Sequence, residues 1–360
     1  MSQEIAKVGI VTIQGRYNYG NRLQNYAVEQ IYSSMGFLPE SLILHRKVTA
    51  GRKAKLAIKF FLGRKETARE NLMSAKRLSA FDRFNERLHL RVIEGYGSSQ
   101  TADYAYISAG SDQIWGLGRC SFGEDWAYLR FARAEQRVAL APSLGVDSIS
   151  SRQSKRLARY VGGFDRLSVR EESGARLIKQ ASGRDAEVIC DPTLVLSATE
   201  WRALASDTLI PEGPYVLAYL LGSSDGEASE VLRTVTHDGV VPVVPLSDRE
   251  RNGEPPAGPA EFISLIDNAT HVVTDSFHAA VFSSILETPL TIVHRSGGEA
   301  FYSRMFGRLK NLSKSIGIEE KMYGSSAYEP SRAGDYEDVI DAISREKNKF
   351  MSYLCGCLNV

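Results

Sequence analysis

A histidine placed directly after a buried-looking strand is the first feature of this sequence that could do chemistry. Residues 271–274 are typical of a strand, and apolar residues recur at helical spacing from 279 to 286. His278 would then lie in the first turn of a helix, beside Asp275 and Ser276. Ligands of open α/β sheets bind at that edge, and helix N-termini attract anions. The stretch predicts an anion site, with a purely structural histidine as the alternative.

Two polar stretches follow strands in the first half of the chain. In the first, Gly20 permits a tight turn, Asn21 can cap a helix, and Arg22 falls in its first turn. This stretch is either a ligand-binding loop or a well-capped, solvated helix start. In the second, Asp112 and Gln113 follow a strand, where a carboxylate could take a proton or orient a hydroxyl. An ordinary helix cap is the alternative.

Two arginines could hold an anion. Arg170 ends a strand, and its guanidinium could grip a carboxylate or phosphate through two parallel hydrogen bonds. A surface ion pair with Glu171 or Glu172 is the alternative, and it would contribute little to stability. Arg304 offers another cation shortly after the histidine.

Strands and helices must alternate to bring these residues together. Such an alternation predicts parallel sheets covered by helices on both faces. The fold class is therefore α/β, with two Rossmann-like domains facing across a cleft: residues 1–200, residues 201–333, and a C-terminal helix and tail at 334–360. The predicted strands are 8–13, 42–45, 104–109, 137–141, 166–169, 187–190, 215–221, 240–245, 271–274 and 290–294. The predicted helices are 23–35, 151–161, 173–180, 227–236, 260–268, 277–288 and 336–354.

The bulk composition is that of an ordinary globular protein. Of the 360 residues, 43% are hydrophobic and 24% are charged, and the net charge of +1 gives no pull toward nucleic acid. No apolar run is long enough to span a membrane, so we expect a cytoplasmic protein. The four cysteines are too few for a disulfide framework and lack zinc spacing, so we expect no metal site.

Five stretches resemble the polysaccharide pyruvyl transferase family. Their order and spacing cover about residues 8–318, nearly the whole chain. Each is weakly specific alone, but five in order are specific for the family and not for the acceptor. They are YNYGNRLQNY (17–26), GSDQIW (110–115), SVRE (168–171), DPTL (191–194) and AEFISLIDNATHVVTDSFH (260–278).

The resemblance implies a GT-B-like fold and an enzyme acting on a cell-envelope or exopolysaccharide glycan. Such enzymes move a pyruvyl group from phosphoenolpyruvate, as co-substrate and without a cofactor, onto two hydroxyls of a sugar. The resulting group is a cyclic ketal. The alternatives are a glycosyltransferase that uses a nucleotide-sugar and a non-catalytic glycan-binding relative.

The site residues follow from the same resemblance. The C-terminal domain would be the donor side, with a phosphate site at 275–279. The N-terminal domain would be the acceptor side. His278 would be the general acid or a phosphate clamp, and Asp112 the base. The expected donor residues are Arg170, Ser276, His278 and Arg304, and the expected acceptor residues are Asn18, Asn21, Arg22 and Gln113.

One departure from the family pattern concerns charge. Other branches read Ser-Arg-Leu-His where this chain reads Asp275-Ser-Phe-His278, so the arginine two positions before the histidine is missing. We expect Arg304 or Arg22 to supply that charge instead.

A basic stretch lies outside the family motifs. Residues 46–69 hold nine Lys/Arg against one acid, Glu66, with apolar residues interleaved at roughly helical spacing. This pattern is typical of a segment that docks on anionic lipid, here at the inner face of the cytoplasmic membrane. A solvated helix whose apolar face covers the N-terminal domain is the alternative.

Overall fold

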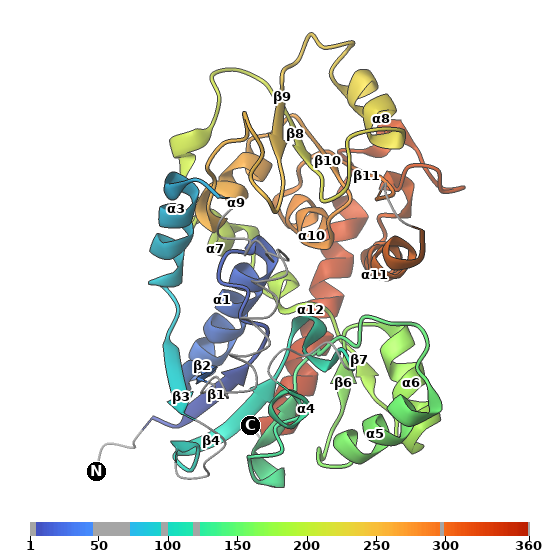
Figure 1. Ribbon diagram of the computed structural model, residues 1–360. Coiled ribbons are helices and arrows are strands. Elements are labelled where there is room, and N and C mark those ends of the chain that lie inside the picture. The colour runs from blue at the N-terminus through green and yellow to red at the C-terminus, as the bar shows by residue number, and fades with distance from the viewer. Residues whose placement is uncertain (1–4, 46–72, 95–99, 118–122, 296–298, 359–360) are drawn as a thin grey trace, which may run out of the picture.

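The protein folds around two parallel sheets, one in each half of the chain (Figure 1). The computed structural model describes residues 5–45, 73–94, 100–117, 123–295 and 299–358, except for the side chains of 299–306. The basic stretch 46–69 lies outside the described residues, and so does the membrane contact predicted for it. In the described part of the chain, no helix is long and apolar enough to cross a bilayer.

The N-terminal sheet has five parallel strands in the order β3-β2-β1-β4-β5. The central strand β1 is apolar and fully buried from Val8 onward, as expected of a strand covered on both faces. The strands are β1 (Lys7–Val11), β2 (Leu38–His45), β3 (Leu90–Glu94), β4 (Tyr104–Ala109) and β5 (Arg137–Ala139).

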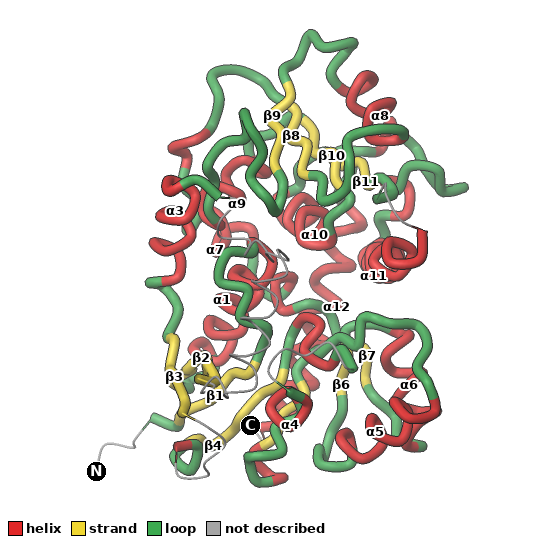
Figure 2. The backbone as a smooth tube through the Cα atoms, in the orientation of Figure 1, coloured by secondary structure: helices red, strands yellow, loops and turns green. Residues whose placement is uncertain are grey.

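The C-terminal sheet has four parallel strands in the order β11-β10-β8-β9. A separate two-stranded parallel sheet, β6 (Ser168–Val169) with β7 (Glu187–Val188), packs with α5 and α6 (Figure 2). The strands of the C-terminal sheet are β8 (Val216–Tyr219), β9 (Val243–Leu246), β10 (His271–Thr274) and β11 (Leu290–Ile292).

Helices connect and cover these strands. They are α1 (Tyr19–Ser34), α3 (Ala75–Asn85), α4 (Glu124–Ala127), α5 (Ser151–Val161), α6 (Glu172–Ser182), α7 (Ala198–Arg202), α8 (Glu227–Val235), α9 (Pro259–Asp267), α10 (Phe277–Leu286), α11 (Glu299–Ile316) and α12 (Glu337–Leu358). The predicted α/β class with two Rossmann-like sheets is confirmed. Strand β3 and helices α3 and α11 were not predicted, although Phe301, Met305, Leu309, Leu312 and Ile316 recur at helical spacing in α11.

Two helices tie the halves together. Helix α3 packs against α9 of the C-terminal half, where the Cβ of an alanine at Gly258 would lie 2.7 Å from the backbone of Ala80. Helix α12 returns to the N-terminal sheet, where the hydroxyl of Tyr353 donates to the Ala139 carbonyl at 2.8 Å. The domain limits near 200 and 333 stay a prediction.

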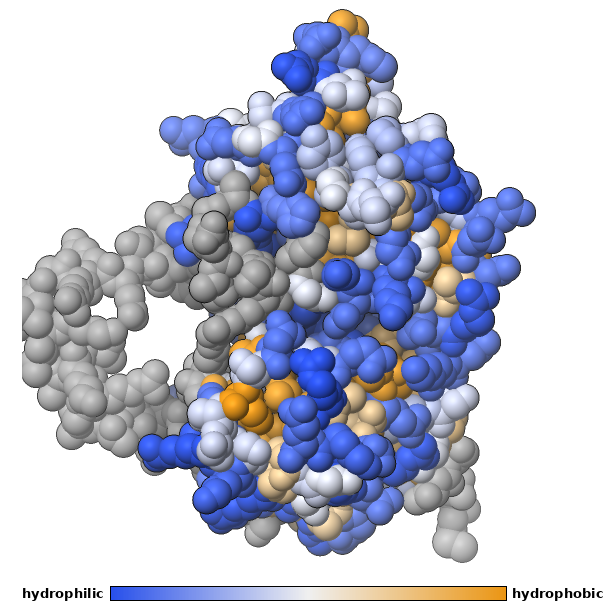
Figure 3. Space-filling model, turned by 90° about the vertical axis from the view of Figure 1, so that its right-hand side faces the viewer, coloured by the Kyte–Doolittle hydropathy of each residue, from blue (hydrophilic) through white to orange (hydrophobic). Residues whose placement is uncertain are grey.

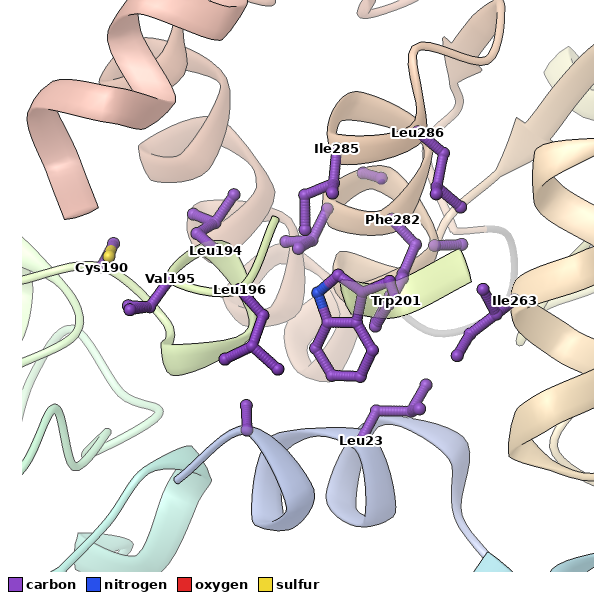
Figure 4. Close-up of a cluster of buried hydrophobic side chains, with 14 of the residues drawn as sticks. Leu23, Cys190, Leu194, Val195, Leu196, Trp201, Ile263, Phe282, Ile285 and Leu286 are labelled. Carbon is purple, nitrogen blue, oxygen red and sulfur yellow. The ribbon is translucent and has the colours of Figure 1, made fainter. Parts of the chain in front are cut away.

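The hydrophobic core is continuous between the halves. Trp201 lies between α1 and α10, and its ring meets Phe282 edge-on at 4.8 Å (Figure 4). Leu23 of α1, below Trp201 in Figure 4, and Ile263 of α9, to its right, belong to the same cluster. On the outer surface in Figure 3, hydrophilic residues surround smaller hydrophobic patches. The shared core fixes the two sheets relative to each other.

Candidate active site between the two sheets

A cavity of about 800 Å³ lies between the two halves and is lined from both. Every strand of the C-terminal sheet contributes a residue that follows its carboxyl end: Leu221 after β8, Arg249 after β9, His278 after β10 and Arg295 after β11. The N-terminal half contributes Asp112 after β4 and, from the start of α1, residues 18–21. The cavity therefore occupies the edge at which open α/β sheets bind ligands.

His278 lies in the first turn of α10, as predicted, with Ser276 at the N-cap. Its Nε2 is shielded from solvent and has no hydrogen-bond partner among the described residues. Burial lowers the pKa of His278, although the carboxylates of Asp191 and Asp112 act in the opposite direction. The imidazole is therefore largely neutral at pH 7, with one nitrogen available to a ligand.

The imidazole rests on the backbone of α1. An alanine Cβ at Gly20 would lie 2.1 Å from Nδ1 of His278 and 2.7 Å from its Cγ. Real Cβ atoms do not approach other atoms so closely, so this contact between the two halves requires glycine. The N-termini of α1 and α10 thus meet at one histidine.

Asp112 faces His278 from the N-terminal half. Its backbone has φ 58°, in the left-handed region, at the start of a short 3₁₀ helix, Asp112–Trp115. The side chain accepts a hydrogen bond from Nδ2 of Asn21. Its Oδ1 lies 3.5 Å from Nη2 of Arg170 and 3.9 Å from Nη1 of Arg308. A carboxylate among these groups can accept a proton from a hydroxyl that enters the cavity.

Arg170 lies behind Asp112 and does not line the large cavity. Its Nη1 donates to Asp191, and its guanidinium stacks 4.7 Å from the ring centroid of Phe277. Burial alone would lower the pKa of Arg170, but the carboxylates of Asp191 and Asp112 raise it. Arg170 lines a second cavity of about 260 Å³, on the other side of Phe277 and Arg308. The surface pairing with Glu171 or Glu172 does not occur.

The predicted acceptor residues divide into two groups. Asn18 and Asn21 line the cavity, and Asn18 also caps α1 by accepting from the Asn21 amide at 3.0 Å. Arg22 points elsewhere, donating to Gln14 at 3.0 Å and Asn85 at 3.3 Å, and burial lowers its pKa to about 10. Arg22 is absent from the cavity lining, so the expectation that it replaces the missing arginine is wrong.

Gln113 contacts Arg308, a cation that was not predicted from the sequence. With its amide oxygen toward α11, Gln113 accepts from both Nη atoms of Arg308 at 3.1 Å. Burial and, to a smaller extent, the neighbouring Arg170 together lower the pKa of Arg308 to about 10. An anion in the cavity would therefore stabilise the charge on Arg308. The side chain of Arg304 lies outside the described residues.

Comparison with known families agrees with this geometry. The sequence model of the polysaccharide pyruvyl transferase family matches residues 18–296. The chain belongs to this family. The match runs from the α1 N-terminus to just beyond Arg295, and so includes both helix N-termini at the cavity. Among curated protein sequences, none matches the chain.

Solved structures that match this pyruvyl transferase family member over nearly its whole length share little of its sequence. A UDP-GlcNAc 2-epimerase from Neisseria meningitidis is 10% identical over 98% of this chain and 100% of that one, with a TM-score of 0.46. A glycosyltransferase from Rickettsia africae ESF-5 is 8% identical over 99% of this chain and 96% of that one, with a TM-score of 0.42. The N-terminal domain of Candida albicans trehalose-6-phosphate phosphatase is 10% identical over 100% and 98%, with a TM-score of 0.45.

Two cavity cations of this family member, Arg295 and Arg308, were not predicted. Arg295 carried a usable signal, because it directly follows the predicted strand 290–294 at the ligand-binding edge. Arg308 lies on α11, which was not predicted, although Met305, Leu309 and Leu312 around it recur at helical spacing. Both lie near the first turn of α10 in space, where they add positive charge to a helix N-terminus.

Proposed function

We propose that the protein transfers a pyruvyl group from phosphoenolpyruvate to two hydroxyls of a sugar in a cell-envelope or exopolysaccharide glycan, forming a cyclic ketal. The observation that carries the proposal is His278, held at the N-terminus of α10 against Gly20, with its Nε2 unbonded among the described residues. Phosphoenolpyruvate bears a phosphate and a carboxylate on three carbons. A helix N-terminus, an imidazole and two arginines suit such a compact polyanion.

The reaction needs one acid and one base. C3 of the enol gains a proton, and the first sugar hydroxyl adds to C2. The bond from C2 to the phosphate oxygen then breaks, and the second hydroxyl adds to C2. Two C–O bonds form and one breaks; of the two hydroxyl protons released, one balances the proton taken up at C3 and the other leaves with phosphate.

The proposed roles follow from position. His278 is neutral in the unliganded site because burial lowers its pKa. A phosphate beside Nε2 would favour the imidazolium, which can then donate a proton. Asp112, on the opposite wall and bonded to Asn21, would take protons from the acceptor hydroxyls. Asn18 and Gln113 would then hold the acceptor, and Arg308 the donor.

Calorimetric titration of the purified protein tests the donor. We expect saturable binding of phosphoenolpyruvate and little heat with UDP-GlcNAc, pyruvate or inorganic phosphate at the same concentrations. His278→Gln should weaken phosphoenolpyruvate binding by about tenfold or more, since hydrogen bonds to charged groups are strong. The matched control is His237→Asn, an exposed histidine with φ 51° after α8, where asparagine is tolerated.

Mass spectrometry of candidate glycans tests the transfer. The expected product gains the mass of one pyruvate less one water, and one phosphate is released per product. Binding of UDP-GlcNAc in place of phosphoenolpyruvate would favour the glycosyltransferase alternative. Binding of glycan alone, with neither donor, would favour a non-catalytic relative.

A further inference from the structure

We propose that Arg295, held in place by Asp275, is a donor-binding residue that presents its guanidinium to the donor beside Ser276. The proposal rests on the proposed function, because the donor is taken to be phosphoenolpyruvate. Asp275 and Arg295 form a buried ion pair at the cavity, not a surface ion pair, and the proposal gives each of them a role.

Asp275 is a buried anchor at the carboxyl end of β10. It is 3% exposed, and its two carboxylate oxygens accept from the backbone amides of Leu221 at 2.8 Å and Gly222 at 2.9 Å. Arg295 donates to Asp275 twice, from Nε to the carboxylate at 3.0 Å and from Nη2 to the backbone carbonyl at 3.0 Å. Asp275 thereby joins the ends of β8, β10 and the segment after β11.

This anchoring orients Arg295 toward the cavity. The side chain is only 9% exposed, yet Arg295 lines the 800 Å³ cavity. A guanidinium has five N–H groups in a rigid fork. Because its position is fixed before a ligand arrives, little side-chain entropy is lost when the fork binds an anion.

Ser276 lies directly beside this pair and leaves the helix N-terminus accessible. Serine at an N-cap usually accepts from a first-turn amide, but the Ser276 side chain makes no such bond in α10. Ser276 and Phe277 both line the cavity. The amides of the first turn, the Nε2 of His278 and the fork of Arg295 therefore converge from one side.

The other arginines near the site contact other residues. Arg170 is bound to Asp191, and Arg22 to Gln14 and Asn85. Arg308 contacts Asp112 and Gln113. Arg295 is thus the arginine anchored next to Ser276, through its hydrogen bond to Asp275.

Titration with phosphoenolpyruvate tests the proposal in the full-length protein. Arg295→Gln is expected to raise the dissociation constant by about tenfold to a hundredfold. The matched control is Arg202→Gln, because Arg202 is also held by an aspartate, Asp267, and by a backbone carbonyl, that of Leu286. Arg202 does not line the cavity, so its replacement should change the dissociation constant by less than about twofold.

A rescue variant separates donor binding from scaffolding. Ser276→Arg combined with Arg295→Gln should recover most of the lost affinity, which a purely structural role of Arg295 would not allow. If Arg295→Gln also lowers the melting temperature, Arg295→Lys keeps a cation beside Asp275. A weaker affinity in Arg295→Lys at wild-type melting temperature would support the proposal.

Unchanged affinity in both Arg295 variants, or no recovery on adding Ser276→Arg, would overturn it. Wild-type protein that binds no phosphoenolpyruvate would overturn the proposed function itself. Wild-type binding with an unaffected Arg295→Gln variant would overturn only this inference.

Discussion

Replacing Gly20 with alanine is expected to displace the imidazole of His278 while leaving the protein folded. The new Cβ would lie 2.1 Å from Nδ1 and 2.4 Å from Cε1 of His278, well inside van der Waals contact at roughly 3.5 Å. Gly20 is in α1, whose backbone is packed into the core, so the ring must move by about 1 Å or more. A displacement of that size can lower turnover about a hundredfold.

The stability effect of Gly20→Ala should be small because two terms oppose each other. Alanine in place of glycine stabilises a helix by up to about 1 kcal/mol. Overpacking costs roughly 1–3 kcal/mol. We therefore expect the free energy of unfolding to fall by no more than about 2 kcal/mol.

Phosphate release from phosphoenolpyruvate in the presence of acceptor, with urea unfolding of the same samples, measures both effects. Gly162→Ala is the matched control, since its Cβ would meet no atom closer than 3.4 Å at the end of α5. That variant should keep wild-type turnover. A Gly20→Ala protein with wild-type turnover would refute the argument that the contact with α1 positions His278.

Three other perturbations give distinct signatures. Asp112→Asn should lower turnover about a hundredfold or more, because the base is lost. Phosphoenolpyruvate should bind no more weakly, because a negative charge leaves the cavity. Equal losses of turnover and of phosphoenolpyruvate affinity would contradict the role of Asp112 as a base. Arg170→Ala should lower the free energy of unfolding by about 3–5 kcal/mol in urea titrations, because Asp191 would remain as a buried, unpaired charge; a change near zero would refute the buried-pair reading. Burial lowers the pKa of His271 to about 4. Between pH 6.5 and 4 the unfolded chain therefore binds more protons than the folded protein does. The free energy of unfolding should fall by up to about 3 kcal/mol as the pH drops through that window. In His271→Gln, the urea midpoint should depend less steeply on pH in the same window. An unchanged pH dependence would mean that other groups cause the loss of stability.

Much of the fold was accessible from local sequence patterns. Strands β4 and β10 and helix α5 begin and end at the predicted residues, because short apolar runs and amphipathic periodicity report burial on a sheet or helix face. The position of His278 in the first turn also follows from local pattern, because β10 ends at Thr274 and α10 begins at Phe277, only three residues later.

Local sequence patterns are therefore sufficient to predict the class of fold, the family, and which residues lie at the ends of strands. Which of those residues contact one another depends on how the two sheets pack. Arg22 was expected in the cavity and Arg308 was not, yet Arg22 donates to Gln14 and Asn85 while Arg308 lines the cavity from α11. Contacts such as Gly20 with His278, or Asp275 with Arg295, join residues distant in the chain through the packing of two sheets. Periodicity carries no information about that packing, because it reports only which face of one element is buried.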